Sequence, residues 1–208
     1  MSKYVSLLIA SVVISSSVLA YQYDDVEIKV TPVAGDVYML QGAGGNIGLL
    51  ATNKGLILVD DQFQPLAKKI EAAMKSIKDQ PLKYVINTHY HGDHTGGNSY
   101  FSHHAPIFAH HNVRNRLADK ENAEASSLPV VTYDNGLTIH LDNETVELTH
   151  LPQGHTDGDT VVYFKQANVL HTGDLFFESR FPYVDLNGRG TVKGYLANIN
   201  TLLAKYPD

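Results

Sequence analysis

The chain contains no cysteine among its 208 residues. Without cysteine there is no disulfide framework, no thiolate metal site and no thiol nucleophile. A basic excess is also lacking, because 16 Lys and Arg stand against 22 Asp and Glu, which gives a formal net charge of −6. A nucleic-acid binder needs a basic face to displace phosphate counterions, so the composition argues against a nucleic-acid partner.

Long apolar runs are missing beyond the amino terminus. Residues 1–20 carry the positive charge of Lys3 near their start, continue through a mostly apolar stretch and end at Ala20, as a secretory signal peptide does. We therefore predict cleavage after Ala20 and a single exported domain over 21–208, periplasmic or secreted, with no stable membrane span. An uncleaved membrane anchor is the alternative.

The pattern of apolar residues predicts a mixture of strands and helices. A helix is expected from Pro65 to Ile77 and another over 112–117, and a last helix over 192–206 carries an apolar stripe along one side. We expect a flexible break at the glycine-rich residues 42–45. The predicted strands cover 26–33, 37–40, 47–51, 56–59, 82–87, 106–109, 137–141, 146–149, 160–164 and 169–171. Such a mixture predicts a layered α/β domain with sheets at its centre.

The predicted strand over 82–87 runs into an H-x-H-x-D-H motif that begins at His89. In an extended chain residues two apart point the same way, so His89 and His91 can converge on one ion. We expect Gly92 to let the backbone turn and bring Asp93 and His94 to a second position nearby. Imidazole nitrogen and carboxylate oxygen suit borderline divalent metals, zinc above all. A polar surface loop is the alternative.

Two further candidates follow later strands. His155 lies in a Gly-His-Thr sequence, and Asp174 follows Gly173. Each is unremarkable alone, because a single histidine in a loop is more often structural than a ligand. Together with the first motif they supply the remaining donors of a two-metal site.

The order of these three motifs resembles the metallo-β-lactamase-fold hydrolase superfamily over nearly the whole mature chain. The resemblance implies an αββα four-layer sandwich with the site at one edge of the two packed sheets. It also implies two divalent metal ions, with Zn²⁺ expected. The first would be held by His89, His91 and His155, the second by Asp93 and His94, and Asp174 would bridge both.

Other residues near the motifs are candidates for supporting roles. Asp60 stands where the family has an acidic residue that fixes the ring tautomer of a ligand histidine, although a hydrogen-bonded turn residue is an equal alternative. His150 and His171 adjoin the site loops and are candidates for contact with the ligands. We expect the remaining pairs to be surface or capping residues: His103, His104, His110 and His111.

The sequence departs from the family pattern in three places. The family normally continues to a further strand and a loop histidine, so the resemblance implies that this C-terminal strand and helix are missing here. The bridging position is Asp174 where the main zinc β-lactamases have cysteine, and Phe177 replaces the lysine that grips the β-lactam carboxylate. These features are more similar to the thioesterases and lactonases of the superfamily. Arg180 or Arg189 is the alternative carboxylate clamp.

The activity that the resemblance implies is metal-dependent hydrolysis of a small-molecule substrate. A hydroxide shared by two ions would open an ester, thioester, lactone or amide, with Asp93 as the catalytic residue that orients it. Phe176, Phe181 and Tyr183 would line an apolar substrate wall, or else pack beneath their loop. Hydrolysis of β-lactams is the leading specific hypothesis. The alternatives are an exported thioesterase or lactonase, an iron-dependent oxidoreductase on the same fold, and a metal-binding module without catalysis.

Overall fold

The computed structural model describes residues 23–206. The predicted signal peptide, residues 1–20, lies outside the described residues, so its cleavage and the export of the protein stay predictions. Within the described range, no helix has the length and apolar character needed to cross a membrane.

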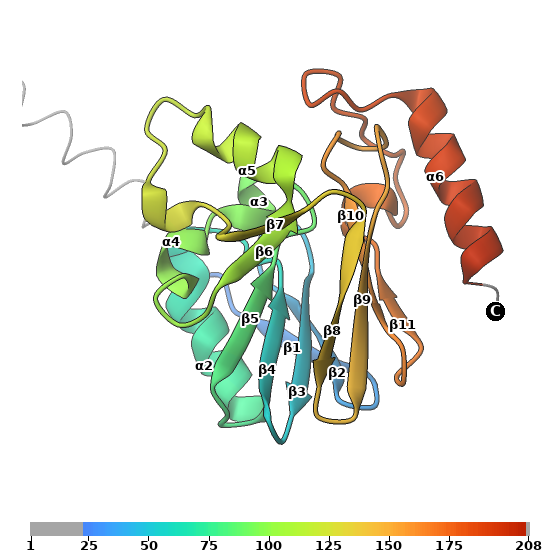
Figure 1. Ribbon diagram of the computed structural model, residues 1–208. Coiled ribbons are helices and arrows are strands. Elements are labelled where there is room, and N and C mark those ends of the chain that lie inside the picture. Colours follow the sequence, from blue (N-terminus) through green and yellow to red (C-terminus); the bar gives the residue numbers. More distant parts are fainter. Residues whose placement is uncertain (1–22, 207–208) are drawn as a thin grey trace, which may run out of the picture.

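A seven-stranded sheet carries the amino-terminal half of the fold, with its strands in chain order from edge to edge (Figure 1). The first four strands pair antiparallel, and β4 to β7 pair parallel. Its strands are β1 (Lys29–Ala34), β2 (Val37–Gln41), β3 (Ile47–Thr52), β4 (Gly55–Val59), β5 (Leu82–Ile86), β6 (Ile107–His110) and β7 (Val131–Tyr133).

The sequence prediction differs from this sheet at two places. β1 begins at Lys29 instead of residue 26, because Lys69 Nζ binds the carbonyl oxygens of Tyr23, Asp24 and Val26 at 3.1, 2.6 and 2.8 Å. These three residues therefore belong to a turn and its following loop, and they do not pair with a neighbouring strand. β7 was not predicted, since a three-residue edge strand is too short to show an alternating pattern.

A second sheet of four antiparallel strands has the order β11-β10-β9-β8. Its strands are β8 (Gly136–Leu141), β9 (Glu144–His150), β10 (Thr160–Phe164) and β11 (Val169–His171). All four were predicted to within a few residues. The helical segments are η1 (Gln64–Leu66), α2 (Ala67–Ile77), α3 (Gly92–Thr95), α4 (Asn98–Phe101), α5 (His111–Ala118), η2 (Ala125–Ser127), η3 (Gly173–Leu175) and α6 (Val192–Lys205).

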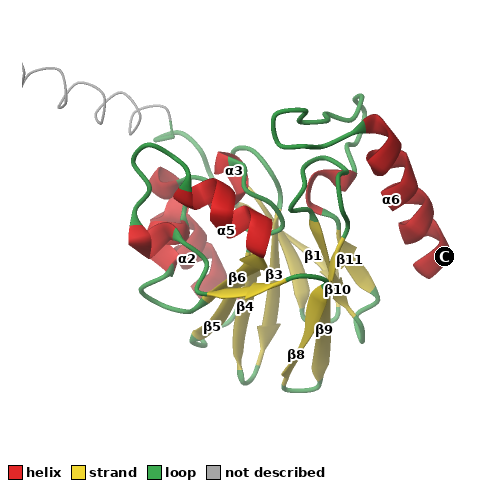
Figure 2. Ribbon diagram, turned by 45° about the horizontal axis from the view of Figure 1, so that its top comes forward, coloured by secondary structure: helices red, strands yellow, loops and turns green. Residues whose placement is uncertain are grey.

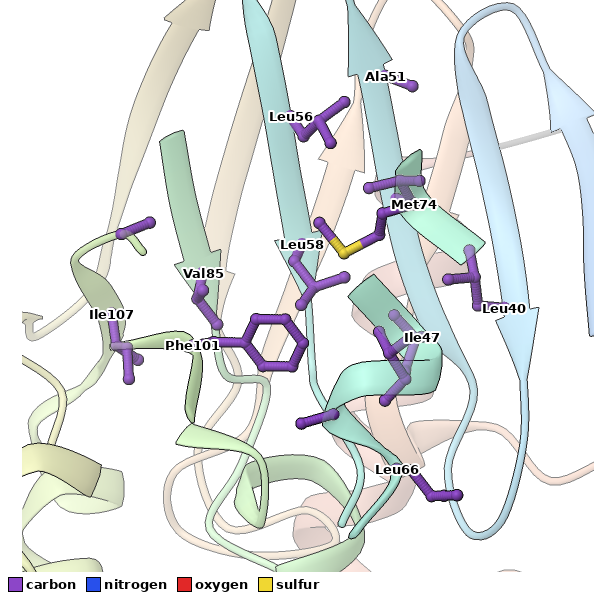
Figure 3. Packing of buried hydrophobic residues seen from close by; sticks show 14 residues of the cluster. Leu40, Ile47, Ala51, Leu56, Leu58, Leu66, Met74, Val85, Phe101 and Ile107 are labelled. Atoms are coloured by element: carbon purple, nitrogen blue, oxygen red, sulfur yellow. The ribbon is translucent and has the colours of Figure 1, made fainter. Parts of the chain in front are cut away.

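Apolar side chains fill the space between the two sheets and the space beneath α2. Val59 and Ile86 of the first sheet share one buried cluster with Val162 of the second. On the outer face of the first sheet, Figure 3 shows Met74 and Phe101 pointing toward Leu58, within a cluster that α2 and α4 cover. The burial of this apolar surface holds α2 on one sheet and that sheet on the other.

Helix α6 covers the outer face of the second sheet, where Tyr195 and Leu202 pack against Val161. The order helix, sheet, sheet, helix confirms the predicted αββα sandwich (Figure 1). The apolar stripe that the sequence placed on this helix is buried only in part, because Ile199 and Tyr206 pack against this cluster whereas Leu196 and Leu203 are exposed. The loops that follow β4, β5, β9 and β11 all lie at one edge of the sandwich (Figure 2).

Candidate metal centre

Three histidine side chains meet at this edge of the sandwich. His89 and His91 follow β5, and His155 lies between β9 and β10. His91 Nδ1 lies 3.1 Å from His89 Nε2 and 2.9 Å from His155 Nε2. With a carboxylate oxygen of Asp174, which η3 supplies, the four potential ligand atoms lie within 4.8 Å of one another. Loops distant in the sequence thus place four donor atoms together.

Two of these rings are fixed from outside by residues 183 and 185. His155 Nδ1 donates a hydrogen bond to the backbone carbonyl of Tyr183 at 2.8 Å. His91 Nε2 donates to Asp185 Oδ2 at 2.9 Å. In a neutral imidazole the nitrogen that does not donate keeps a lone pair. The lone pairs of His155 Nε2 and His91 Nδ1 therefore face each other.

The third ring is fixed through a hydroxyl group. His89 Nδ1 lies 3.0 Å from Thr88 Oγ1, and this hydroxyl donates its one hydrogen to Asp60 Oδ2 at 2.8 Å. Thr88 Oγ1 is therefore an acceptor toward His89, whose proton sits on Nδ1. His89 Nε2 consequently presents its lone pair to the same centre as the other two rings.

His94 lies beside this cluster with carboxylates on both sides. Its Nδ1 donates to Asp60 Oδ2 at 2.7 Å, and its Nε2 lies 3.1 Å from Asp174 Oδ1 and 3.6 Å from Asp93 Oδ2. The second oxygen of Asp174 lies 3.5 Å from His155 Nε2. Asp174 therefore spans the space between His94 and the three-histidine cluster.

Burial and charge act differently on these groups. Burial lowers the pKa of His89 well below its ordinary value, and the neighbouring His94 lowers it further. Burial also lowers the pKa of His155. Burial alone would lower the pKa of His94 too, but the carboxylates of Asp60 and Asp174 raise it well above its ordinary value. Burial opposes ionisation of Asp174, yet contact with His94 keeps the pKa of that carboxyl low.

The donor set fits a divalent cation. Three imidazole lone pairs converge with no hydrogen-bond donor between them, which is unfavourable unless a positive charge lies there. Within the described residues, His94 Nε2 is a buried atom without a hydrogen-bond partner of good geometry. Histidine nitrogen and aspartate oxygen are also the ligands that borderline divalent metals accept.

The predicted break at the glycine-rich residues 42–45 lies between β2 and β3, and the structure shows in addition that these residues form a packed wall of the site. A Cβ at Gly45 would lie 2.2 Å from His94 Cε1, and one at Gly44 would lie 2.4 Å from Asp93 Cβ. Gly44 also has a φ of +82°, which favours glycine. Gly45 N donates to Asp93 Oδ2 at 3.1 Å, while the buried Gln62 binds Gly45 O at 2.6 Å.

Gly92 was expected to let the backbone turn, and the structure does not bear this out. It begins α3, after His91 at the N-cap, and its φ does not lie in the left-handed region. A Cβ at this position would meet nothing within 4 Å. The short helix, and not the freedom of glycine, brings Asp93 and His94 to their places.

Two cavities of about 600 and 550 Å³ open beside the Asp174 carboxylate. Phe177 and Arg180 line both of them, and the Arg180 guanidinium lies 4.9 Å from the Phe177 ring centroid. Arg189 lines neither. The second cavity is bounded by Phe63, His91, Gly92, Asp93, Asp174, Phe177, Arg180, Phe181 and Tyr183.

The aromatic residues after η3 form the wall of these cavities. Phe176 lines the first cavity and is 69% exposed, while Phe181 and Tyr183 line the second and are 96% and 58% exposed. They do not pack beneath their loop, which was the alternative. An exposed aromatic patch beside a polar cluster is typical of a ligand-binding surface.

Six of the remaining histidines divide into three groups. His171 binds Asn46 O through Nε2 at 3.1 Å and accepts from Gly173 N, so it holds the turn before Asp174 without a hydrogen bond to a predicted ligand. His103 and His104 are exposed, as expected. His110 and His111 lie at the start of α5, and His150 lies at the end of β9.

His110 corrects the expectation of a surface residue. It is the N-cap of α5, where its Nδ1 accepts from Asn112 N, so the capping part of the prediction is confirmed. It is buried, however, and its ring stacks on His150 with the centroids 3.6 Å apart. His111 is partly exposed and pairs with Asp134 at 2.7 Å.

Four groups that fix the site were missed by the sequence reasoning: Thr88, Tyr90, Asp185 and the carbonyl of Tyr183. Thr88 and Tyr90 adjoin the histidine motif, but their types carry no ligand signal. Asp185 lies 94 residues from His91 in the chain, and no spacing rule links the two. Their role follows only from the folded arrangement.

The four-layer fold and the His/Asp cluster define a metalloprotein with its centre on an αββα sandwich. The chain belongs to the metallo-beta-lactamase superfamily, whose family model matches residues 40–206. A solved metallo-beta-lactamase from Pontibacter korlensis has the same fold, with a TM-score of 0.76 and 22% identity over 88% of this chain and 87% of that one.

Two curated relatives differ in what their names describe. Metallo-beta-lactamase IND-1 of Chryseobacterium indologenes is 25% identical over 217 residues, which cover 99% of this chain and 88% of that protein. A hydroxyacylglutathione hydrolase of Pelagibacter ubique is 27% identical over 129 residues, which cover 61% of this chain and 48% of that protein. The chain spans 57% and 52% of the length of two fungal lactamase-like proteins, from Emericella nidulans and Aspergillus niger.

Proposed function

We propose that the protein is an exported, zinc-dependent hydrolase that opens a carbonyl ester, thioester, lactone or amide bond, with β-lactams as the leading substrate. The observation that carries this proposal is the cluster in which three histidine lone pairs and the Asp174 carboxylate converge beside His94. His89, His91 and His155 would hold one cation, Asp93 and His94 a second, and Asp174 both. When bound, divalent cations supply Lewis-acid activation of water and of a carbonyl group.

Asp93 is the residue that we assign to orienting the nucleophilic water. The backbone N–H of Gly45 holds its Oδ2 at 3.1 Å, and its carboxylate borders the second cavity. A carboxylate held in this way accepts a hydrogen bond from water and points it at a substrate in that cavity. Phe177, Phe181 and Tyr183 give the same space an apolar wall.

Two observations favour a β-lactam as the substrate. Arg180 borders both cavities, and its guanidinium suits the carboxylate that such a molecule carries. The similarity to metallo-beta-lactamase IND-1 extends over 99% of this chain. Arg180 would thus take the role of the lysine that Phe177 replaces.

A thioester is the second candidate, and a specific observation favours it. The group that would bridge the two cations is the carboxylate of Asp174, which lies near both His94 and His155, as the resemblance to thioesterases and lactonases implies, and not a cysteine thiolate. The similarity to a hydroxyacylglutathione hydrolase points the same way.

A substrate panel on the zinc-loaded protein tests the proposal. It contains a chromogenic cephalosporin, a lactone and a thioester, and each is assayed with the parent, His91→Ala and His155→Ala. Because each change removes a converging lone pair, we expect less bound metal and a fall in kcat/KM of at least about 100-fold on the accepted substrate.

The exposed His103 supplies the control, and His103→Ala should retain parental metal content and turnover. Full turnover in either site variant would contradict the ligand assignment. Bound iron with substrate-dependent oxygen uptake would replace the hydrolase by an oxidoreductase. Tight metal binding without turnover of any panel member would favour a non-catalytic module.

A further inference from the structure

The segment over residues 183–190, between η3 and α6, runs across the three-histidine cluster. The carbonyl oxygen of its first residue, Tyr183, accepts a hydrogen bond from His155 Nδ1, the ring nitrogen that points away from the cluster. Asp185 N donates to His155 O at 2.9 Å, and Asp157 N donates to Gly188 O at 2.8 Å. The segment therefore lies beside the cluster and is held by hydrogen bonds to the loop that carries His155.

One oxygen of the Asp185 side chain collects two hydrogen bonds. Asp185 Oδ2 accepts from Tyr90 Oη at 2.5 Å and from His91 Nε2 at 2.9 Å. The side chain of Asp185 is 7% exposed, so water does not compete freely for these contacts. Tyr90 is the residue between the two histidines of the motif, so the motif itself supplies both donors.

A second contact network supports Tyr90 from the other side. Arg116 of α5 binds Asp157 through two hydrogen bonds, Nε to Oδ1 at 2.7 Å and Nη2 to Oδ2 at 2.8 Å. Its guanidinium lies 5.0 Å from the centroid of the Tyr90 ring. The tyrosine is thus held between Arg116 and Asp185, and its hydroxyl group has a fixed direction.

We propose that Asp185 is a positioning residue that sets the cation affinity of the three-histidine cluster. It acts through His91, whose ring it holds with Nδ1 toward the centre, and Tyr90 in turn holds the Asp185 carboxylate. The inference rests on the metal binding that the proposed function includes, but on no particular substrate. A ring without such a partner divides its time between tautomers and orientations, and the carboxylate also makes the ring a stronger donor to a cation.

Binding of Co²⁺ alone to the protein freed of metal tests this role without any turnover. Affinity is measured by competition with a chelator, and the visible absorption of Co²⁺ reports the ligand geometry. We expect Asp185→Ala to weaken binding about 10- to 100-fold and to shift the absorption bands. Asp185→Asn keeps an acceptor for His91, so it should recover part of the loss, and it carries the test if the alanine variant does not fold.

Tyr90→Phe completes a double-mutant cycle. Alone it should weaken Co²⁺ binding less than Asp185→Ala does. In the Asp185→Ala background it should change nothing further, because Tyr90 acts through Asp185. If the losses of Co²⁺ affinity in the two single variants added up in the double variant, Tyr90 would not act through Asp185.

Asp134 provides a matched control, because it also pairs with a histidine, His111, at 2.7 Å, but lies outside the cluster. Asp134→Ala should leave the affinity for Co²⁺ and the absorption bands unchanged. Parental affinity and bands in both Asp185 variants would overturn the proposal, and a parent that binds no Co²⁺ would overturn it together with the proposed function. A parent that binds Co²⁺ and hydrolyses no substrate would overturn the hydrolase proposal alone.

Discussion

At the scale of single residues, one carboxylate controls two rings of the site. Asp60 accepts hydrogen bonds from Thr88 N, Thr88 Oγ1 and His94 Nδ1, at 2.8, 2.8 and 2.7 Å. It orients His94 directly and His89 through the threonine hydroxyl. Asp60 and Gln62 both have positive φ values, 64° and 52°, so the turn that presents them is strained. Strain of this kind persists where the surrounding contacts fix it, which is common at functional sites.

Gly45→Ala tests how closely the glycine wall is fitted to the site. The added Cβ would overlap the His94 ring, so we expect His94 to move, the bound metal per chain to fall and the midpoint of thermal unfolding to drop. Metal content is measured by elemental analysis, and unfolding is followed by circular dichroism.

Gly92→Ala is the control for this change, since Gly92 lies beside the same ligands with open space around it. Alanine should raise the free energy of unfolding slightly, by roughly 0.5 kcal/mol, because it restricts the unfolded chain. Equal effects of the two substitutions would contradict the role given to residues 44 and 45.

At the scale of elements, α6 buries a polar side chain together with apolar ones. Asn198 is buried on the same side as Tyr195 and Leu202, and its Nδ2 donates to Pro152 O at 3.2 Å. This bond attaches the helix to the loop after β9. The apolar residues Leu196 and Leu203 lie on the other side of the helix and face outward, although their spacing would suit a buried stripe.

Two adjacent leucines of α6 make this orientation testable. Leu202 is 8% exposed and Leu203 is 68% exposed. We expect Leu202→Ala to lower the free energy of unfolding by about 2 kcal/mol, because it leaves a cavity against the second sheet. Leu203→Ala should change it by less than about 0.5 kcal/mol. Denaturation in urea measures both, and the reverse order would contradict the orientation.

Elements with a strong local pattern could be predicted from the sequence. The alternation in β9, the short apolar run in β10 and the apolar spacing in α2 depend on neighbouring residues, so the positions of these elements follow from the chain itself. The three-residue β7 and the four-residue α3 have too few residues for a period to show. They form because tertiary contacts hold them, as the Thr88 and Asp60 contacts hold the region around α3.

The candidate site was predictable to a similar and limited degree. Residue types and spacing were enough to single out His89, His91 and Asp174 as candidates, because metal ligands have a narrow chemistry. Asp185 was not predictable, since its function depends on which ring the folded chain brings to it. Contacts between segments that are distant in the chain cannot be predicted from local sequence patterns.

At the scale of the whole molecule, a stacked pair of histidines joins the two sheets away from the metal centre. His110 ends β6 of the first sheet, and His150 ends β9 of the second. Burial lowers the pKa of His110 to about 4, with further contributions from His150 and His111. Burial also lowers the pKa of His150. Two carboxylates act on this pair: Asp134, which pairs with His111 and raises the pKa of His110, and Asp157, which raises the pKa of His150.

Stability should therefore depend on pH through His110. In the unfolded chain its imidazole titrates near 6.5, so between pH values of about 4 and 6.5 the unfolded state binds more protons. The stabilising contribution is fully present above about 6.5 and is lost as the pH falls toward 4. Its full size is at most roughly 3.5 kcal/mol, at about 1.4 kcal/mol for each pKa unit.

His110→Asn removes this titration and keeps a good helix N-cap. Urea denaturation at pH values of about 4.5 and 7, with a chelator present to remove metal, should show a smaller change in the free energy of unfolding than the parent shows. The exposed His103→Asn should behave like the parent. An unchanged pH dependence in His110→Asn would show that this group is not responsible.

The donors at the metal centre come from both halves of the molecule. His89, His91 and His94 follow a strand of the first sheet, whereas His155 and Asp174 follow strands of the second. A cation held by donors from both sheets would link the two sheets, which are otherwise held together by apolar packing. At a free concentration of about one hundred times Kd, the cation would raise the free energy of unfolding by about 2.7 kcal/mol. A shortage of metal would therefore do more than stop any catalysis. It would also shorten the lifetime of the protein, because the two sheets would separate more often and expose the chain to proteases.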